Sequence, residues 1–135
     1  MITEHELSLK LADARNFLLE EIGVIPEIGI ILGSGLGAFA DLVKEKNVIS
    51  YKEIPHFPVS TVEGHSGKLV IGKLGNKQVM VLQGRFHYYE KYEMHEVTFP
   101  VRVMQTLGIG GLVVTNAAGG INKAFRPGDL VVIKD

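Results

Sequence analysis

Apolar residues recur at roughly helical intervals along the N-terminal part of the chain and predict a helix over about residues 4–22. The residues of this apolar stripe are Leu7, Leu9, Leu11, Ala12, Phe17, Leu18 and Ile22. Thr3 and Glu6 have the spacing of a capping box, in which each side chain bonds the main-chain N–H of the other residue. Gly23 is expected to end this helix. The chain is therefore expected to begin with a capped helix of defined length.

Beyond this helix, short apolar runs predict the strands of a sheet. The strands are expected at residues 28–32, 68–74, 77–82, 111–115 and 129–134. The runs 28–32 and 111–115 are apolar on both faces, as in the buried strands of a parallel sheet. Gly75-Asn76, between the second and third predicted strands, is typical of a hairpin turn.

Helices and loops account for the remaining segments. A short helix is expected to run toward Val43, and the stretch 54–67, which is rich in Pro, Gly and His, is expected to be a loop. Another helix is predicted between His95 and Leu107, where Pro100 places the regular part late or kinks it. The order of helix, strand, loop, helix, hairpin, helix, strand and strand indicates an α/β fold with a mixed sheet, partly parallel and partly antiparallel.

Composition narrows the possible classes of protein. The 135 residues are 46% hydrophobic and 21% charged, which favours a single domain, residues 1–135, with a buried core. A net charge of -1 provides no basic field for nucleic acid, and neither a signal peptide nor a membrane-spanning run is visible, so we expect no nucleic-acid or membrane partner. The absence of Cys excludes disulfides and a thiol nucleophile and fits a cytoplasmic location.

The most informative segment is 84–90, which follows the apolar run 79–82 and brings Arg, His, two Tyr and Glu together. Arg85 and His87 have the same strand parity, so both can point one way if the strand persists. A guanidinium and an imidazole together suit a tetrahedral oxyanion. Such loops lie at the carboxyl ends of parallel strands in α/β sheets, where ligands bind. The segment therefore predicts one wall of an anion pocket.

Neighbouring side chains extend this interpretation. Glu90 can orient the imidazole of His87 by accepting from its second nitrogen. Tyr88 and Tyr89 can offer a ring face or a hydroxyl to a sugar. The structural alternative is an exposed salt bridge between Arg85 and Glu90, worth under ~1 kcal/mol.

A glycine-rich loop, residues 33–37, follows the first predicted strand. Its main-chain N–H groups can wrap an oxyanion, the Ser34 hydroxyl adds a donor, and a following helix N-terminus adds a favourable dipole. One alternative is a tight turn that needs Gly for packing. Another is a dinucleotide fingerprint ending at Ala38, which would indicate an NAD-dependent oxidoreductase. That fingerprint requires an acidic residue about 20 residues further on, at the end of a strand. Glu53 lies near this spacing, but the sequence around it is a poor match to a strand.

Two further segments carry candidate chemistry. Residues 115–120 follow a predicted strand, where Asn116 offers an amide and the alanine N–H groups can donate to an oxyanion; a plain strand exit is the alternative. His65 lies between glycines in the long loop, where a solvated surface histidine is the alternative. Neither a His-x-x-x-His pair nor a carboxylate cluster is present in the sequence, so no metal is expected.

These motifs, taken in order, resemble one known family. They are Gly-Ser-Gly-Leu-Gly, Glu-Gly-His-Ser-Gly, Gln-Gly-Arg-Phe-His-Tyr-Tyr-Glu, Val-Thr-Phe-Pro-Val-Arg and Thr-Asn-Ala-Ala-Gly-Gly. Together they resemble the trimeric class of purine nucleoside phosphorylases over essentially the whole chain. The resemblance implies a three-layer fold with a mixed, largely parallel central sheet. Methylthioadenosine phosphorylases, which remain an alternative, typically have Gly-Thr-Gly, Arg-His-Gly and a Cys at the corresponding places.

The resemblance also implies roles for individual residues. The phosphate contacts that it implies are Ser34, His65, Arg85, His87 and the main-chain N–H of Ala117. Tyr89 is expected to contact the ribose, Asn116 to border the base pocket, and Phe86 to contribute main-chain atoms. The implied reaction is reversible phosphorolysis of purine nucleosides to free purine and ribose 1-phosphate, without cofactor or metal. Arg85, Ser34 and His87 are expected to hold the attacking phosphate.

The chain departs from this family in length. Family members are considerably longer, and their purine-recognising Glu and Asn, a further phosphate-binding Ser and a ribose-contacting His have no match here. We therefore expect the N-terminal half of a nucleoside phosphorylase fold, incomplete at its C-terminus, which is inactive or nearly so by itself. A non-catalytic fragment that binds phosphate or nucleoside is the alternative. Homo-oligomerisation is expected, as a trimer in the parent family.

Overall fold

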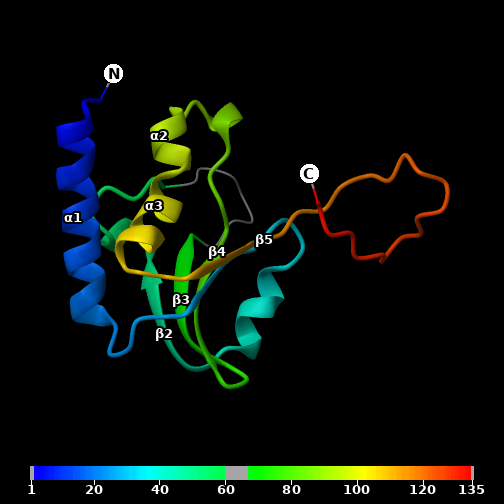
Figure 1. The fold of residues 1–135 in the computed structure, drawn as a ribbon, viewed down its shortest axis with the longest axis horizontal. Helices are drawn as coiled ribbons and strands as arrows, with labels where there is room; N and C mark the ends of the chain where they lie inside the picture. The colour runs from blue at the N-terminus through cyan, green and yellow to red at the C-terminus, as the bar shows by residue number, and fades with distance from the viewer. Residues whose placement is uncertain (1, 60–66, 135) are drawn as a thin grey trace.

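A five-stranded sheet runs through the centre of the protein, in the order β2-β3-β4-β1-β5 (Figure 1). The computed structural model describes residues 2–59 and 67–134. The strands are β1 (Ile28–Ile31), β2 (Lys44–Ser50), β3 (Lys68–Leu74), β4 (Lys77–Gln83) and β5 (Gly111–Val114). Strand β1 pairs in parallel with β4 and β5, whereas β3 pairs antiparallel with β2 and β4. The expected mixed sheet is confirmed, but its parallel part is confined to β4, β1 and β5.

Helices cover the two faces of the sheet unequally. The α-helices are α1 (Glu4–Glu21), α2 (Met94–Val97) and α3 (Phe99–Thr106), and the 3-10 helices are η1 (Gly37–Leu42), η2 (Tyr51–Glu53) and η3 (Tyr88–Glu90). Helices α1 and α3 pack on one face, where Leu18 and Val103 join Leu69, Met80 and Leu82 in the larger core cluster. The opposite face carries a smaller cluster, to which η1 contributes Ala40. The expected three layers are present, but the helical layer on the face covered by η1 is thin.

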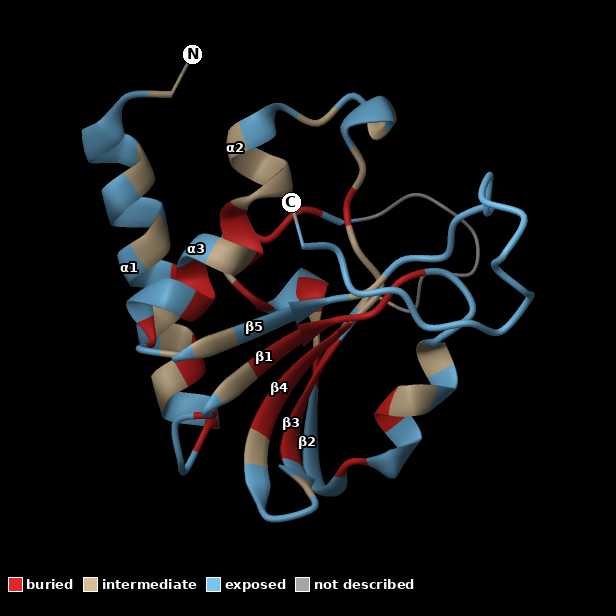
Figure 2. Ribbon diagram, turned by 45° about the vertical axis from the view of Figure 1, so that its right-hand side comes forward, coloured by how far each residue is buried: buried red, intermediate tan, exposed pale blue. Residues whose placement is uncertain are grey.

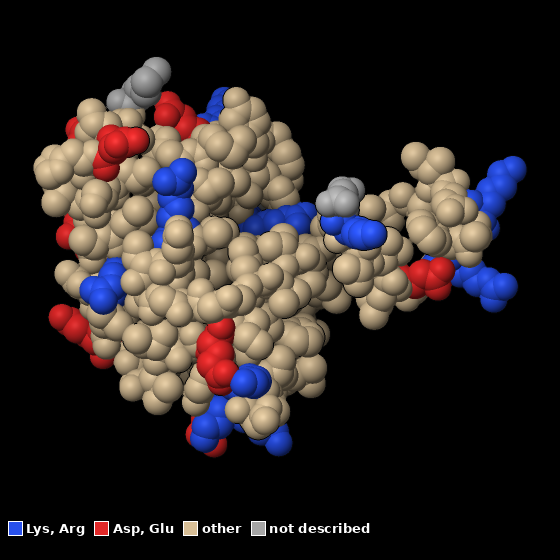
Figure 3. Space-filling view, viewed as in Figure 1, with Lys and Arg blue, Asp and Glu red and all other residues tan. Residues whose placement is uncertain are grey.

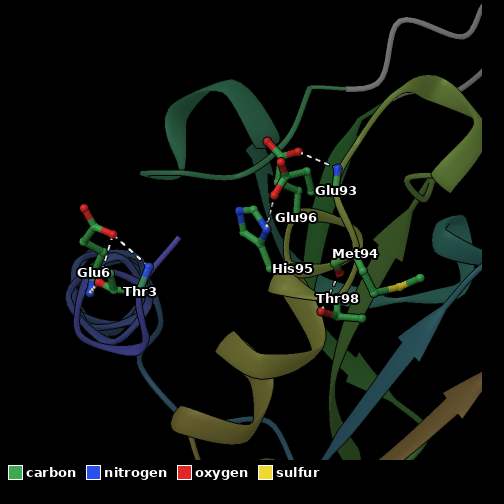
Figure 4. A network of polar contacts seen from close by, with 7 residues as sticks. All are labelled: Thr3, Glu6, Glu93, Met94, His95, Glu96 and Thr98. Carbon is green, nitrogen blue, oxygen red and sulfur yellow. Dashed lines mark hydrogen bonds and ion pairs between the residues drawn. The ribbon is translucent and has the colours of Figure 1, made fainter. Parts of the chain in front are cut away.

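Helix boundaries follow from local capping. The capping box between Thr3 and Glu6 is present, with the Glu6 main-chain N–H donating to Thr3 Oγ1 at 3.2 Å, and it lowers the pKa of Glu6 through hydrogen bonds from Thr3 (Figure 4). The same device begins α2, where the Glu93 main-chain N–H donates to Glu96 Oε2 at 2.8 Å. The helix predicted between His95 and Leu107 breaks at Thr98, and Pro100 lies in the first turn of α3, which needs no N–H from it.

Strand β2 was not predicted, because its sequence is largely polar. Residues 44–48 are exposed, and the register shifts between Lys44 and Asn47, next to Glu45 with a φ of 49°. Such irregularity and charge are common on edge strands. The neighbouring hairpin of β3 and β4 is as predicted, and Gly75 adopts the positive φ of 61° that its turn requires.

The C-terminal part of the chain differs from the prediction. Strand β5 was expected to be buried, but it lies at the sheet edge, and Leu112, Val113 and Val114 are exposed (Figure 2). The predicted strand 129–134 is wrong: residues 115–134 contain no helix or strand, and the segment projects from the body of the molecule (Figure 1). An apolar run becomes a strand only when another strand pairs with it, and none of the described strands pairs with residues 129–134. Within residues 2–59 and 67–134, no helix is long and apolar enough to cross a membrane.

Candidate active site

The three parallel strands bring their following loops to one edge of the sheet. Ile31 at the end of β1 is in register with Leu82 of β4 on one side and with Val114 of β5 on the other. Loops 33–37, 84–87 and 115–117 therefore leave the sheet side by side. Carboxyl ends of parallel strands are the usual position of ligand sites in α/β sheets. The expected convergence of the three loops is thus present in the fold.

Thr115 connects the first of these loops to the last. The Gly33 main-chain N–H donates to Thr115 Oγ1 at 2.9 Å, and this hydroxyl donates to the Ile31 carbonyl at 3.1 Å. A Cβ atom on Gly33 would lie only 2.6 Å from the Thr115 carbonyl oxygen and 2.9 Å from Asn116 Cα. The two backbones can approach this closely only because residue 33 is glycine.

Arg85 connects the loop after β4 to Thr115 as well. Its Nη1 donates to the Thr115 carbonyl at 3.1 Å. Its Nε is buried and has no hydrogen-bond partner among the residues that the structure describes. A buried donor without an acceptor is unfavourable by about 1–3 kcal/mol, so this guanidinium has one hydrogen-bonding group whose acceptor the described residues do not supply.

The strand on which the shared parity of Arg85 and His87 depends does not persist. Strand β4 ends at Gln83, and Gly84 follows with a φ of 106°, which turns the chain away from the strand direction. Arg85 is therefore directed toward Thr115 by a turn and not by the alternation of a strand. The two residues remain neighbours on one loop, as the sequence suggested.

Phe86 anchors this loop in the protein core. Its side chain is only 5% exposed, and its ring lies 5.3 Å from that of Tyr51 and 5.9 Å from that of Tyr92. The Tyr51 hydroxyl donates to the Gly84 carbonyl at 2.7 Å, and burial raises the pKa of Tyr51. The residue expected to offer only main-chain atoms thus has a buried side chain that fixes its neighbours Arg85 and His87.

His87, Tyr89 and Glu90 form a second group on the loop. The rings of His87 and Tyr89 stack with centroids 4.7 Å apart, and Tyr89 is 74% exposed. Glu90 Oε1 accepts from the main-chain N–H of His87 at 3.0 Å, and the Glu90 N–H donates to the His87 carbonyl at 3.0 Å. This contact to the main chain holds the backbone of His87 at the start of η3.

The remaining predicted residues lie on the first and last loops. Ser34 is exposed on the loop after β1, next to Gly35 with its positive φ of 84°. Asn116 and Ala117 are exposed on the loop after β5. His65 lies outside the described residues. The expected helix dipole beside Ser34 has little structural basis, because η1 is a 3-10 helix of only six residues and has no side-chain cap.

Two residues of this edge were not given a role from the sequence. One is Thr115, whose bridging hydroxyl is described above. The other is Gln83, whose Nε2 donates to the Gly37 carbonyl at 2.9 Å and so ties the end of β4 to the first loop. The only available signal was a polar residue that directly follows an apolar strand, which is too common to identify a bridge.

The described groups at this edge of the sheet can bind an anion but are not arranged to bind a metal ion. Among residues 2–59 and 67–134, no group of three His, Cys, Asp or Glu side chains could hold a metal ion. Acidic and basic side chains are interspersed over the face in Figure 3, and basic side chains lie in the recess where the projecting segment leaves the body. A guanidinium beside a glycine-rich loop suits a tetrahedral oxyanion.

The arrangement does not support the dinucleotide-binding alternative. The strand that follows β1 in the chain is β2, which lies at the opposite end of the sheet from β5 and pairs antiparallel with β3. A βαβ unit would instead place a parallel strand next. Glu53, which lies near the spacing of the fingerprint's acid, accepts from the Ser50 main-chain N–H at 2.9 Å within a capping box.

Comparison with known proteins agrees with this geometry. The sequence profile of the phosphorylase superfamily matches residues 27–135, which include all three loops. The chain belongs to the phosphorylase superfamily. Within this superfamily it is similar to purine nucleoside phosphorylase 1 of Geobacillus stearothermophilus, with 57% identity over 93% of the chain and 46% of that protein.

Solved structures within the phosphorylase superfamily share the fold. Isoform 2 of purine nucleoside phosphorylase from Schistosoma mansoni, in complex with cytosine and ribose-1-phosphate, has a TM-score of 0.83 and 44% identity, over 90% of this chain and 42% of that one. A Schistosoma purine nucleoside phosphorylase in complex with hypoxanthine has a TM-score of 0.80 and 46% identity, over 88% of this chain and 41% of that one. The chain thus spans about half the length of the relatives it matches.

Proposed function

We propose that the chain binds inorganic phosphate at the carboxyl ends of β1, β4 and β5, as part of a site for reversible phosphorolysis of purine nucleosides. The observation that carries the proposal is the buried Nε of Arg85, which has no partner among the described residues. A phosphate oxygen placed there would accept from Nε, and the glycine-rich loop after β1 lies across the same edge. Charge-assisted bonds of this kind are among the strongest in proteins.

The reaction needs a phosphate that is held and aimed. The glycosidic C–N bond breaks, its electron pair leaves with the purine, and the purine takes up a proton. A phosphate oxygen forms the new bond to the anomeric carbon, which gives ribose 1-phosphate. Phosphate held by Arg85, Ser34 and His87 would stabilise the cation-like sugar and be positioned to attack it. The names of the relatives and the ribose-1-phosphate in the Schistosoma complex support this assignment.

The sugar and the base would lie beyond the phosphate. The exposed ring of Tyr89, stacked on His87, is placed to contact a ribose, and Asn116 is placed to border a base. The reaction uses phosphate as co-substrate and needs no cofactor in this proposal. We propose that the parent activity is that of a glycosyltransferase of purine salvage in the cytoplasm.

Phosphate binding tests the proposal directly. Isothermal titration of the purified chain with inorganic phosphate is expected to show saturable binding that sodium chloride at matched ionic strength does not reproduce. The lack of saturable binding throughout the millimolar range would overturn the proposal. Inosine phosphorolysis by the chain alone is expected to be absent or nearly so, and turnover at the rate of an intact phosphorylase would contradict that expectation.

Further measurements separate the alternatives. Tight binding of a nicotinamide dinucleotide without phosphate dependence would favour an oxidoreductase. A preference for methylthioadenosine over inosine in a catalytically competent complex would favour a methylthioadenosine phosphorylase. Phosphate binding together with exchange into an intact trimer, but without any turnover, would favour a non-catalytic fragment.

We also propose that the chain associates with copies of itself through the β5 edge. Val113 and Val114 leave this edge apolar and exposed, whereas charges and an irregular register protect the β2 edge at the other end of the sheet. Sedimentation is expected to show concentration-dependent association, and Val113→Lys is expected to weaken it. The matched control is Val48→Lys, which changes an exposed valine of β2. A monodisperse monomer at all concentrations would contradict this proposal.

A further inference from the structure

We propose that Thr115 is a positioning residue for phosphate, because it fixes the glycine-rich loop after β1 relative to the guanidinium of Arg85. The inference rests on the proposed phosphate site, and it adds a residue to which neither the sequence nor the family resemblance gives a role. Thr115 itself need not touch the ligand. It would act through the glycine-rich loop and the Arg85 guanidinium, which touch the phosphate.

Four hydrogen bonds converge on this one residue, and one of them runs from its main-chain N–H to the Ile31 carbonyl at 3.0 Å. The Thr115 hydroxyl accepts from the Gly33 N–H at 2.9 Å and donates to the Ile31 carbonyl at 3.1 Å. The Thr115 carbonyl accepts from Arg85 Nη1 at 3.1 Å. The hydroxyl therefore bonds the loop after β1, and the carbonyl of the same residue bonds the loop after β4. Since the residue lies at the end of β5, it connects all three loops.

The side-chain type at this position matters. A hydroxyl supplies one donor and two acceptor lone pairs, so it can serve Ile31 and Gly33 at once. The branched Cβ of threonine restricts χ1 and holds the oxygen in one place. Because Gly33 has no Cβ, the loop lies directly against the Thr115 carbonyl, and a small displacement of either backbone would be transmitted to the other. The distance between the loop and the Arg85 guanidinium is thereby fixed.

Replacement of the hydroxyl gives a specific expectation. Thr115→Val keeps the shape but removes both side-chain hydrogen bonds, and it leaves the carbonyl that holds Arg85 in place. We expect the dissociation constant for inorganic phosphate to rise about tenfold, the change that follows from an unpaired part-buried donor. Thr115→Ser keeps the hydroxyl and is expected to restore affinity to within about threefold of the wild type.

A second threonine provides the matched control. The Thr106 hydroxyl donates to the Val103 carbonyl at 2.8 Å in a part-buried hydrogen bond, but the residue itself is exposed at the end of α3, outside the three loops. Thr106→Val is expected to change thermal stability without changing the phosphate affinity of the folded chain. A merely structural role for Thr115 would predict the same behaviour for Thr115→Val.

The outcomes distinguish this inference from the proposed function. If the wild-type chain does not bind phosphate, the proposed site fails. If the wild type binds and Thr115→Val binds equally well, the positioning role fails. Amide hydrogen exchange in the wild type decides the matter without any variant: phosphate is expected to slow exchange at the Gly33 N–H. Unchanged exchange at Gly33 under saturating phosphate would overturn the role even if Thr115→Val does not fold.

Discussion

Replacement of Arg85 with alanine is expected to reduce phosphate affinity by more than about 100-fold. Each hydrogen bond to a charged partner contributes about 1.5–3 kcal/mol, and the guanidinium is placed to offer Nε and a further N–H to the anion. Arg85→Lys keeps the positive charge but loses the planar fork. We therefore expect Arg85→Lys to bind with intermediate affinity, which titration with inorganic phosphate would measure.

The thermal stability of Arg85→Ala provides a second test of the phosphate contact. In the free chain, Nε has no partner among the described residues and opposes folding, whereas Nη1 is paired with the Thr115 carbonyl at 3.1 Å. Loss of the side chain removes one unfavourable and one favourable contribution, so we expect a small net change in unfolding free energy. Phosphate is expected to raise the melting temperature of the wild type but not that of Arg85→Ala, because a ligand stabilises only the state that binds it.

Arg102 provides the control for charge. It lies on α3 and is exposed, so Arg102→Ala makes the same change in net charge away from the three loops. We expect Arg102→Ala to bind phosphate as the wild type does. Equal affinities of Arg85→Ala and Arg102→Ala would show that Arg85 makes no specific contact, and the site would have to lie elsewhere.

Local signals in the sequence predicted much of the fold. The capping box of Thr3 and Glu6 and the stop at Gly23 located α1, and Gly75-Asn76 located the hairpin, because these elements depend on neighbouring residues. Strand β2 was missed because its pairing with β3 compensates for a polar sequence. The predicted strand 129–134 failed for the opposite reason, since an apolar sequence without a pairing strand stays irregular.

The sequence predicted which loops form the candidate site better than it predicted how they are arranged. Three loops after apolar strands pointed to one edge, which the parallel register of β1 with β4 and β5 provides. The turn at Gly84 was not visible, because a positive φ is a property of the folded backbone. The bridge made by Thr115 was invisible as well, since it depends on which residues the register places opposite Gly33.

The largest loss of stability is expected from Phe86→Ala, because the Phe86 side chain joins the core to the site. The ring is 5% exposed and packs among Tyr51 and Tyr92. Truncation of a buried Phe typically lowers the unfolding free energy by about 3–5 kcal/mol, a large fraction of the total for a small domain. Denaturant titration would measure this as a lower midpoint.

Phe125→Ala is the matched control, because Phe125 is 47% exposed in the projecting segment. Its truncation is expected to change the unfolding free energy by less than about 0.5 kcal/mol. Phe86→Leu, which keeps most of the buried volume, should retain most of the stability. A loss for Phe86→Ala no larger than that for Phe125→Ala would contradict the described packing.

The same variant tests whether the core positions the site. Phe86 lies between Arg85 and His87, and the Tyr51 hydroxyl that holds the Gly84 carbonyl belongs to the aromatic cluster around the ring. When the ring is lost, the loop loses its anchor, and the guanidinium should no longer rest against Thr115. Under conditions where Phe86→Ala is still folded, we therefore expect weaker phosphate binding as well as lower stability. Undiminished affinity would mean that the hydrogen bond from Arg85 to Thr115 is sufficient to position the guanidinium without the core beneath it.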